Sequence, residues 1–213
     1  MTEHIDNDRL HEDIHYRFDY FSKFISFTSE DISALNMFAS SAASVIPVIV
    51  DSVYRKLFQY DITKTYFIIH NDVFDGHSKK NENISLDSAQ MVYRRDMLSG
   101  YLKRLLLQRQ WTNEFLAYLS RVGRMHTNKV GAASINVDFI HINATLAYIE
   151  NLLVETVWSN ENFDNNTKKN VLLALNKVFR IQTDLFLMHY LESSQDNSSI
   201  RTTNHEKGKC ICS

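Results

Sequence analysis

The sequence is short of the residues that end helices. Only 5 of its 213 residues are glycine and 1 is proline, whereas average usage is about 7% and about 5%. Few turns and long helices follow, and the apolar residues recur at spacings of three and four rather than two. Strand patterns bounded by Gly or Asn-Gly signals are missing. The sequence therefore predicts an all-α protein.

Other absences narrow the function. No apolar run approaches the roughly 18 residues that a membrane span needs, and the polar, acidic start MTEHIDNDRLHED is unlike a secretory signal, so we expect a cytoplasmic protein. A net charge of −2 gives no electrostatic footprint for nucleic acid. The two cysteines lie in the last four residues and form no disulfide framework. The common nucleotide-binding loops, the HExxH zinc motif and the G-x-S-x-G nucleophile elbow are all missing.

The helical pattern falls into separate segments. We expect a helix over about 8–25, then a long region from the capping-box pair Thr28 and Asp31 to about residue 60, with a kink or break at Pro47. A short connecting helix over 61–70 precedes a polar loop over 70–85. Four further helices are predicted, over about 86–109, 111–127, 137–159 and 163–192.

One histidine lies on an apolar helix face. Phe115, Leu119, Val122 and His126 recur at spacings of four, three and four, so all four side chains are predicted to point inward. A buried imidazole needs a partner, which is a carbonyl, a carboxylate or a metal. His189 stands near polar residues and is predicted to face solvent.

Three segments, YLSRVGRMHT, INVDFIHINATLAY and FDYFSKFISFTSEDI, resemble the protoglobin and globin-sensor family over about residues 14–192. The resemblance implies a globin-like helical fold with an extra N-terminal helix, so we expect a domain over 1–192 and a disordered tether over 193–213. In that family the histidine matching His126 is the proximal ligand of haem iron. The resemblance therefore implies haem b as cofactor and a diatomic gas, O₂, CO or NO, as ligand, in a gas binder or sensor.

The resemblance also implies residues of the haem pocket. Tyr54 matches a tyrosine that the family places over the distal face of the haem, where its phenol can donate a hydrogen bond to bound O₂. The alternative is a core aromatic with its hydroxyl at the surface. Val53 stands where the compared member has a tryptophan, which implies a wider distal gate. Leu146 matches a pocket aromatic on the helix after the histidine.

Two assignments leave alternatives open. Met97 falls near the position of a distal phenylalanine, but a gap of about two residues is needed, so Leu98 and Tyr101 compete with it. His141 lies on a helical stripe of its own and is the rival ligand to His126; two histidines on one iron would favour electron transfer over gas binding. The resemblance gives His141 no ligand role, and we expect it in the core or near the haem propionates.

The end of the sequence suggests a lipid anchor. Cys210-Ile211-Cys212-Ser213 has the C-a-a-X pattern of farnesylation, with Lys207 and Lys209 upstream. Lipidation at Cys210 would bring the protein to the cytoplasmic face of a membrane, although one prenyl group and two lysines make a modest anchor. The alternative is a tail with two incidental thiols.

A rival hypothesis is a haem-free helical adaptor that reaches membranes through the same tail. It predicts that His126→Ala leaves folding and partner binding intact, whereas a haem protein loses its cofactor. We expect a binding protein rather than an enzyme, because nitric oxide dioxygenase or peroxidase activity would need a reductase or a distal acid–base pair. The identity of the gas and dimerisation through the last two helices are left open.

Overall fold

The computed structural model describes residues 2–69, 84–128 and 135–206, with the backbone alone at 69 and at 193–206. These residues form helices and connecting turns and no strand, so the all-α prediction is confirmed for them. The predicted loop over 70–85 falls mostly outside the described residues. The helices are α1 (Asn7–Glu12), α2 (Ile14–Phe24), α3 (Ser29–Ala42), α4 (Ile46–Leu57), α5 (Asp61–Ile69), α6 (Ala89–Leu107), α7 (Asn113–Met125), α8 (Phe139–Trp158) and α9 (Asn165–Glu206).

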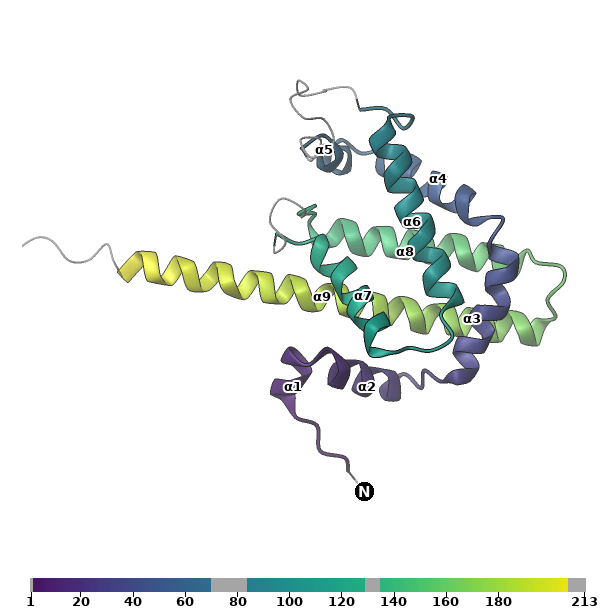
Figure 1. Ribbon diagram of the computed structural model, residues 1–213, viewed down its shortest axis with the longest axis horizontal. Helices are drawn as coiled ribbons and strands as arrows, with labels where there is room; N and C mark the ends of the chain where they lie inside the picture. The colour runs from purple at the N-terminus through teal and green to yellow at the C-terminus, as the bar shows by residue number, and fades with distance from the viewer. Residues whose placement is uncertain (1, 70–83, 129–134, 207–213) are drawn as a thin grey trace, which may run out of the picture.

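The helices pack around α9, the longest of them. It lies along α8, and it also contacts α3, α7 and α2. Helix α6 packs against α3 and α4, and α2 packs against α7 (Figure 1). The C-terminal part of α9 runs on past the other helices (Figure 1).

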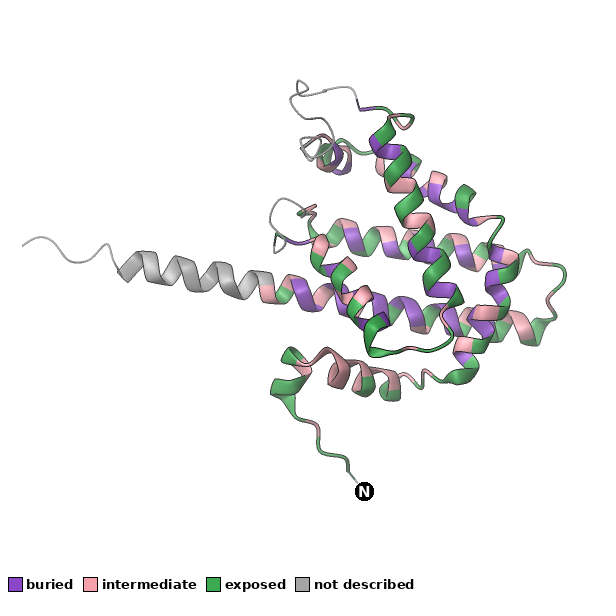
Figure 2. Cartoon of the chain, in the orientation of Figure 1, coloured by how far each residue is buried: buried purple, intermediate pink, exposed green. Residues whose placement is uncertain are grey.

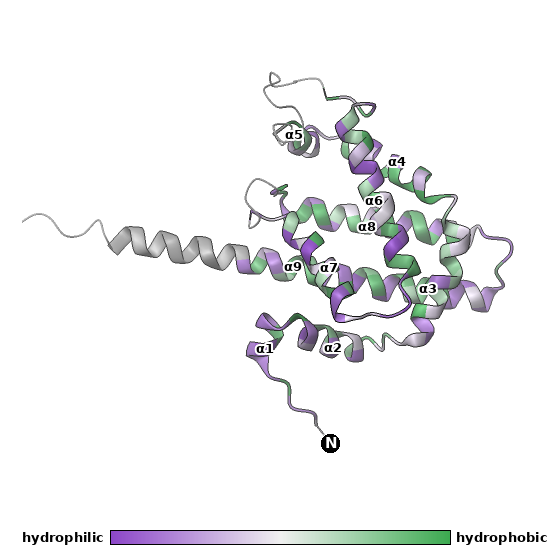
Figure 3. Ribbon diagram, in the orientation of Figure 1, coloured by the Kyte–Doolittle hydropathy of each residue, from purple (hydrophilic) through white to green (hydrophobic). Residues whose placement is uncertain are grey.

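The core lies where these helices face one another (Figure 2). Helices α4 and α8 carry much of the hydrophobic sequence, while α1 is mainly hydrophilic (Figure 3). The largest fully buried side chains come from elements far apart in the chain, so the core ties the whole bundle together; they include Phe38, Met91, Leu102, Phe115, Leu119, Ile149 and Phe179. The inward positions predicted for Phe115 and Leu119 are confirmed.

The N-terminal helix predicted over about 8–25 is divided at Asp13. The carboxylate of Asp13 accepts hydrogen bonds from the backbone N–H groups of His15, at 3.0 Å, and Tyr16, at 3.1 Å. An N-cap of this kind starts a new helix, since its side chain supplies an acceptor to the first free amides. Asp13 therefore ends α1 and begins α2.

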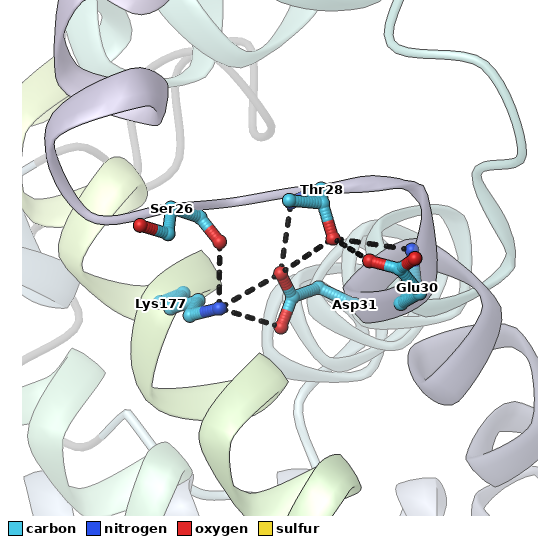
Figure 4. Close-up of polar contacts among 5 residues, drawn as sticks. All are labelled: Ser26, Thr28, Glu30, Asp31 and Lys177. Carbon is cyan, nitrogen blue, oxygen red and sulfur yellow. Dashed lines mark hydrogen bonds and ion pairs between the residues drawn. The ribbon is translucent and has the colours of Figure 1, made fainter.

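The capping box predicted at Thr28 and Asp31 is present at the start of α3. The Thr28 backbone N–H donates to Asp31 Oδ2 at 2.8 Å, and the Glu30 N–H donates to the Thr28 hydroxyl at 3.3 Å. Lys177 of α9 reaches this corner and donates through Nζ to both Asp31 oxygens, at 2.9 Å each, and to the Ser26 carbonyl at 2.7 Å (Figure 4). We call these five residues the Asp31 cluster; it fastens α3 to α9.

The break predicted at Pro47 is also confirmed. Helix α3 ends at Ala42 and α4 begins at Ile46, and the two helices meet at 87°. Pro47 occupies the first turn of α4, where its missing N–H leaves no hydrogen bond unmade. Within the described part of the chain no single helix is long and apolar enough to cross a membrane; α3 and α4 pass that test only as a bent pair.

The end of α9 differs from the prediction. We expected the last helix to stop near residue 192 and a tether to follow, but the helical backbone continues to Glu206. The sequence after residue 192 holds no proline, and its first glycine is Gly208. Each further residue of an existing helix adds a hydrogen bond without a new nucleation step, so nothing in this stretch stops the helix.

Candidate functional site

His126 stands at the end of α7, where the helix gives way to the segment leading to α8. Helix α7 begins with Thr112, whose hydroxyl accepts a hydrogen bond from the Phe115 N–H at 3.4 Å. His126 is its C-cap residue, and its ring lies 5.3 Å from the ring of Phe186 on α9. The close approach of the two helices depends on Gly123, because a Cβ there would lie 3.3 Å from the Leu185 carbonyl oxygen and from the Phe186 Cα.

The hydrogen bond of the His126 ring fixes which nitrogen is available. Nδ1 lies 2.8 Å from the Val122 carbonyl oxygen. A carbonyl oxygen only accepts, so Nδ1 carries the hydrogen, and the neutral ring keeps its lone pair on Nε2. This is the arrangement in which a metal-binding histidine is usually held, with one nitrogen bonded to a carbonyl and the other free for the metal.

The electrostatic surroundings keep His126 neutral. Burial lowers the pKa of the imidazole; the hydrogen bond to Val122 opposes this, and the positive charge of Arg94 lowers the pKa further. Neutral imidazole is the form that binds metals, because the protonated ring has no free lone pair. His126 is therefore held in the ligand form at physiological pH.

Tyr190 of α9 holds the backbone on either side of the segment that follows His126. Its hydroxyl lies 2.6 Å from the Val137 carbonyl oxygen and 3.1 Å from the His126 carbonyl oxygen. The Val137 N–H also donates to the His126 carbonyl at 3.0 Å. The sequence analysis missed Tyr190, because its spacing of 64 residues from His126 leaves no local signal.

Tyr54 lies in the interior, on α4. Its hydroxyl donates to the Arg94 carbonyl at 3.0 Å, and its ring lies 5.9 Å from that of Phe67. Burial raises the pKa of Tyr54 to about 12, so the phenol stays protonated and remains a donor. Tyr54 is buried and its hydroxyl is bonded to a backbone carbonyl, so its place over a haem stays a prediction.

Two other predicted pocket residues, Val53 and Leu146, are buried. They come from α4 and α8, which contact each other, and both belong to the hydrophobic cluster that contains Tyr54 and Phe186. Their burial fits an apolar pocket wall, and it fits the core of any helical protein equally well. Their contact with haem therefore stays a prediction.

Met97 does not face the interior as predicted, since it is 56% exposed. At about 100° per residue, Met97 lies about 60° around α6 from Arg94, at the edge of the inward face. Tyr101 is buried and Leu98 packs against the core, so these two alternatives fit an inward position better. The prediction placed Met97 on the wrong part of the helix circumference. It did so because the gap of about two residues needed to match the family can be placed in more than one way.

The remaining histidines differ in their surroundings. The His141 ring lies 5.8 Å from that of Tyr66. His189 was predicted to face solvent, but it is only 6% exposed: Nε2 lies 2.8 Å from the Ser120 hydroxyl and Nδ1 lies 3.2 Å from a Glu192 carboxylate oxygen. Ser120 lies inside α7, so this chain of hydrogen bonds joins α7 to α9.

Arg94 is a second residue that the sequence analysis missed. It stands three residues after Met91 and four before Leu98, on the apolar stripe of α6, so a charged residue at an inward position was visible in the sequence. Its charge acts on both Tyr54 and His126. Cys210, the predicted lipidation residue, lies outside the described residues.

The helical fold and the available Nε2 of His126 are typical of one class, the all-α proteins that enclose a haem between packed helices. The globin domain of the Geobacter sulfurreducens globin-coupled sensor has a similar structure, with a TM-score of 0.63 and 15% identity over 81% of this chain and 96% of that one. The family model of protoglobin matches residues 14–196. The chain belongs to the protoglobin family, and the globin-like fold is thereby confirmed. No curated protein sequence matches it.

Membership of a globin family implies a haem cofactor, and the residues present fit one. His126 offers a neutral ring with Nε2 free. The Nε of Arg94 is one of five buried side-chain polar atoms found without a hydrogen-bond partner in the described residues, and it is the one that belongs to a charged group. Haem carries two carboxylates as well as its iron, so a donor left unpaired in the protein alone is suited to a haem site.

Proposed function

We propose that this protein binds haem b through Nε2 of His126 and takes up a diatomic gas, O₂, CO or NO, as a gas binder or sensor. The observation that carries the proposal is the hydrogen bond from Nδ1 of His126 to the Val122 carbonyl, which leaves Nε2 as the free nitrogen of a neutral ring. When bound, haem iron with one histidine ligand supplies an open coordination position for a gas.

The residues of the chain would divide the work between them. His126 would hold the iron, and its orientation is set by Val122, by the Phe186 ring and by the bonds of Tyr190 to the adjoining backbone. Tyr54, protonated and buried, would turn its hydroxyl from the Arg94 carbonyl to a ligand whose oxygens gain negative charge, which favours O₂ over CO. Val53 and Leu146 would keep water away from the site.

The test is an ultraviolet-visible spectrum of the purified wild type and of His126→Ala, each reduced and then exposed to CO. We expect a Soret band that shifts with CO in the wild type and is lost or strongly altered in the variant. His141→Ala is the matched control, because it removes a partly buried histidine that contacts Tyr66 instead, and its spectrum should match the wild type. A wild type that stays colourless after haem is added would refute the proposal.

Membrane tethering through Cys210 is a separate proposal, supported by the C-a-a-X pattern and the two nearby lysines. It is tested by expressing the full chain and Cys210→Ser in eukaryotic cells with a clickable prenyl analogue. We expect label and membrane fractionation for the wild type alone. Label-free wild type in the soluble fraction would leave the gas-binding proposal intact and remove the tether.

A further inference from the structure

Two consecutive arginines on α6 have opposite surroundings. Arg95 has two partners within the protein, since it donates to Asp51 Oδ1 at 3.0 Å and to the Leu86 carbonyl at 2.9 Å. Arg94 points to the inward side of the helix, where its guanidinium carbon lies 5.4 Å from the centre of the Phe67 ring. Among the described residues no carboxylate forms an ion pair with Arg94, and its Nε is buried without a partner.

An arrangement of this kind works against folding. Burial lowers the pKa of Arg94, which shows that the charged form is disfavoured where it lies. A guanidinium offers five N–H donors, and a buried donor without an acceptor carries its desolvation penalty uncompensated. An apolar side chain of similar length would fill the same inward position without that penalty. The arginine is therefore better matched to a ligand than to the protein around it.

The position of Arg94 indicates what the ligand is. Its backbone carbonyl accepts the hydrogen bond of Tyr54, and its charge shifts the pKa of Tyr54 and of His126. The guanidinium is thus close to both residues that we assign to the haem site. A cation beside Phe67 and Tyr54 favours an anion, and the planar fork of arginine suits a carboxylate or another oxyanion.

We propose that Arg94 is the anion-binding residue of the haem site, pairing with a negatively charged group that arrives with the ligand. The inference rests on the proposed function. The same chemistry has two sources: a carboxylate of the haem itself, or an anion bound at the iron. Asp51 and the Leu86 carbonyl pair with Arg95, so they are not acceptors for Arg94, which is free for this role.

The experiment compares Arg94→Met with Arg95→Met. Methionine keeps an unbranched apolar stem in each case and removes the guanidinium, so the two variants differ in whether the lost group had partners within the protein. The first measurement is urea unfolding of the haem-free proteins. We expect Arg94→Met to be as stable as the wild type or more stable, and Arg95→Met to be less stable. A loss of stability in Arg94→Met equal to that in Arg95→Met would show that Arg94 is a structural residue and overturn the proposal.

Two binding measurements then separate the sources of the anion. The first is azide titration of the ferric haem protein, followed by its spectrum. The second is the ratio of affinities for haem and for haem dimethyl ester, in which both carboxylates are blocked. In Arg94→Met we expect one of these to fall about tenfold or more: azide affinity if the anion sits at the iron, or the preference for haem over its ester if the partner is a haem carboxylate. Arg95→Met should change neither.

The failures are distinguishable. If wild-type protein takes up no haem, the proposed function fails. If haem binds through His126 and Arg94→Met changes neither azide affinity nor the preference over the ester, the proposed function stands and the role of Arg94 is refuted.

Discussion

The Asp31 cluster and the region around His126 both place charged or polar groups inside a helical protein. They differ in whether each of these groups has a hydrogen-bond partner within the protein. In the Asp31 cluster every buried side-chain polar atom has a partner: Lys177 is shared between a carboxylate and a carbonyl, and Asp31 also caps α3. Near His126, the free Nε2 of the ring and the unpartnered Nε of Arg94 remain. The first arrangement is satisfied within the protein, whereas the second leaves two nitrogens without a hydrogen-bond partner among the described residues.

The largest effect on this comparison should come from Asp31→Ala. It removes the capping box and leaves Lys177 without its carboxylate partner, so we expect the free energy of unfolding to fall by about 3 kcal/mol. Haem uptake by the folded fraction should not change. Urea unfolding measures the first quantity and haem titration the second, and Glu155→Gln, at an exposed position of α8, serves as control. If fully folded Asp31→Ala, measured without urea, bound haem more weakly than the wild type, the Asp31 cluster and the His126 region would not be independent.

Lowering the pH should weaken the His126 region without a mutation. Burial lowers the pKa of His126 and of His189, while the unfolded chain titrates near pH 6.5. Below about pH 6.5 the unfolded state therefore binds more protons, and stability falls as pH falls, by up to about 1.4 kcal/mol per pH unit for each histidine. Unfolding of the haem-free protein at pH 7.5 and 5.5 measures this, and His189→Gln should make the dependence shallower. A stability that is flat across this range would contradict the burial of both rings.

Tyr190→Phe tests the support of His126 from α9. It removes the only hydrogen of a hydroxyl shared between the carbonyls of Val137 and His126, so we expect a loss of about 1–2 kcal/mol in stability. Haem dissociation should also become faster, because the residue that holds the iron loses part of its positioning. Transfer of haem to an excess of apomyoglobin follows the dissociation rate. An unchanged rate together with lower stability would confine Tyr190 to a structural role.

Tyr54→Phe should have the smallest effect on folding, about 1 kcal/mol for the bond to the Arg94 carbonyl. Its main consequence concerns the ligand: O₂ should dissociate several-fold faster while CO dissociation changes little, because only bound O₂ gains enough negative charge to need the donor. Stopped-flow displacement measures both rates. Equal effects on the two gases would mean that Tyr54 acts through packing alone.

Much of the fold was predictable because it depends on local rules. Pro47 and the Thr28–Asp31 pair act within one turn of chain, and both did what their positions predicted. Asp13 divided a helix that the apolar spacing joined, since a capping side chain leaves the hydrophobic period unbroken. The end of α9 was missed because no residue before Gly208 forbids helix, and a polar composition alone does not end one.

The site was less predictable, because it depends on contacts across the bundle. The inward face that carries His126 was visible in the sequence. The hydrogen bond to Val122, which leaves Nε2 free, is visible only in the three-dimensional structure. His189 stands just before a polar stretch of the sequence but is covered by α7, through Ser120 and Gly123. Arg94 carried a signal that was overlooked, a charge on an apolar stripe, and Met97 was misplaced by a helical phase of about 60°.

The hydrogen bond from Tyr190 to the carbonyl of His126 connects α9 directly to the backbone of the histidine. From Tyr190 to Glu206 the helix rises about 24 Å, beyond the bundle that holds its first part (Figure 1). A tilt of about 5° about Tyr190 would carry the far end of such a rod through about 2 Å. If α9 tilted about Tyr190, its largest displacement would therefore be at its C-terminal end, away from the core.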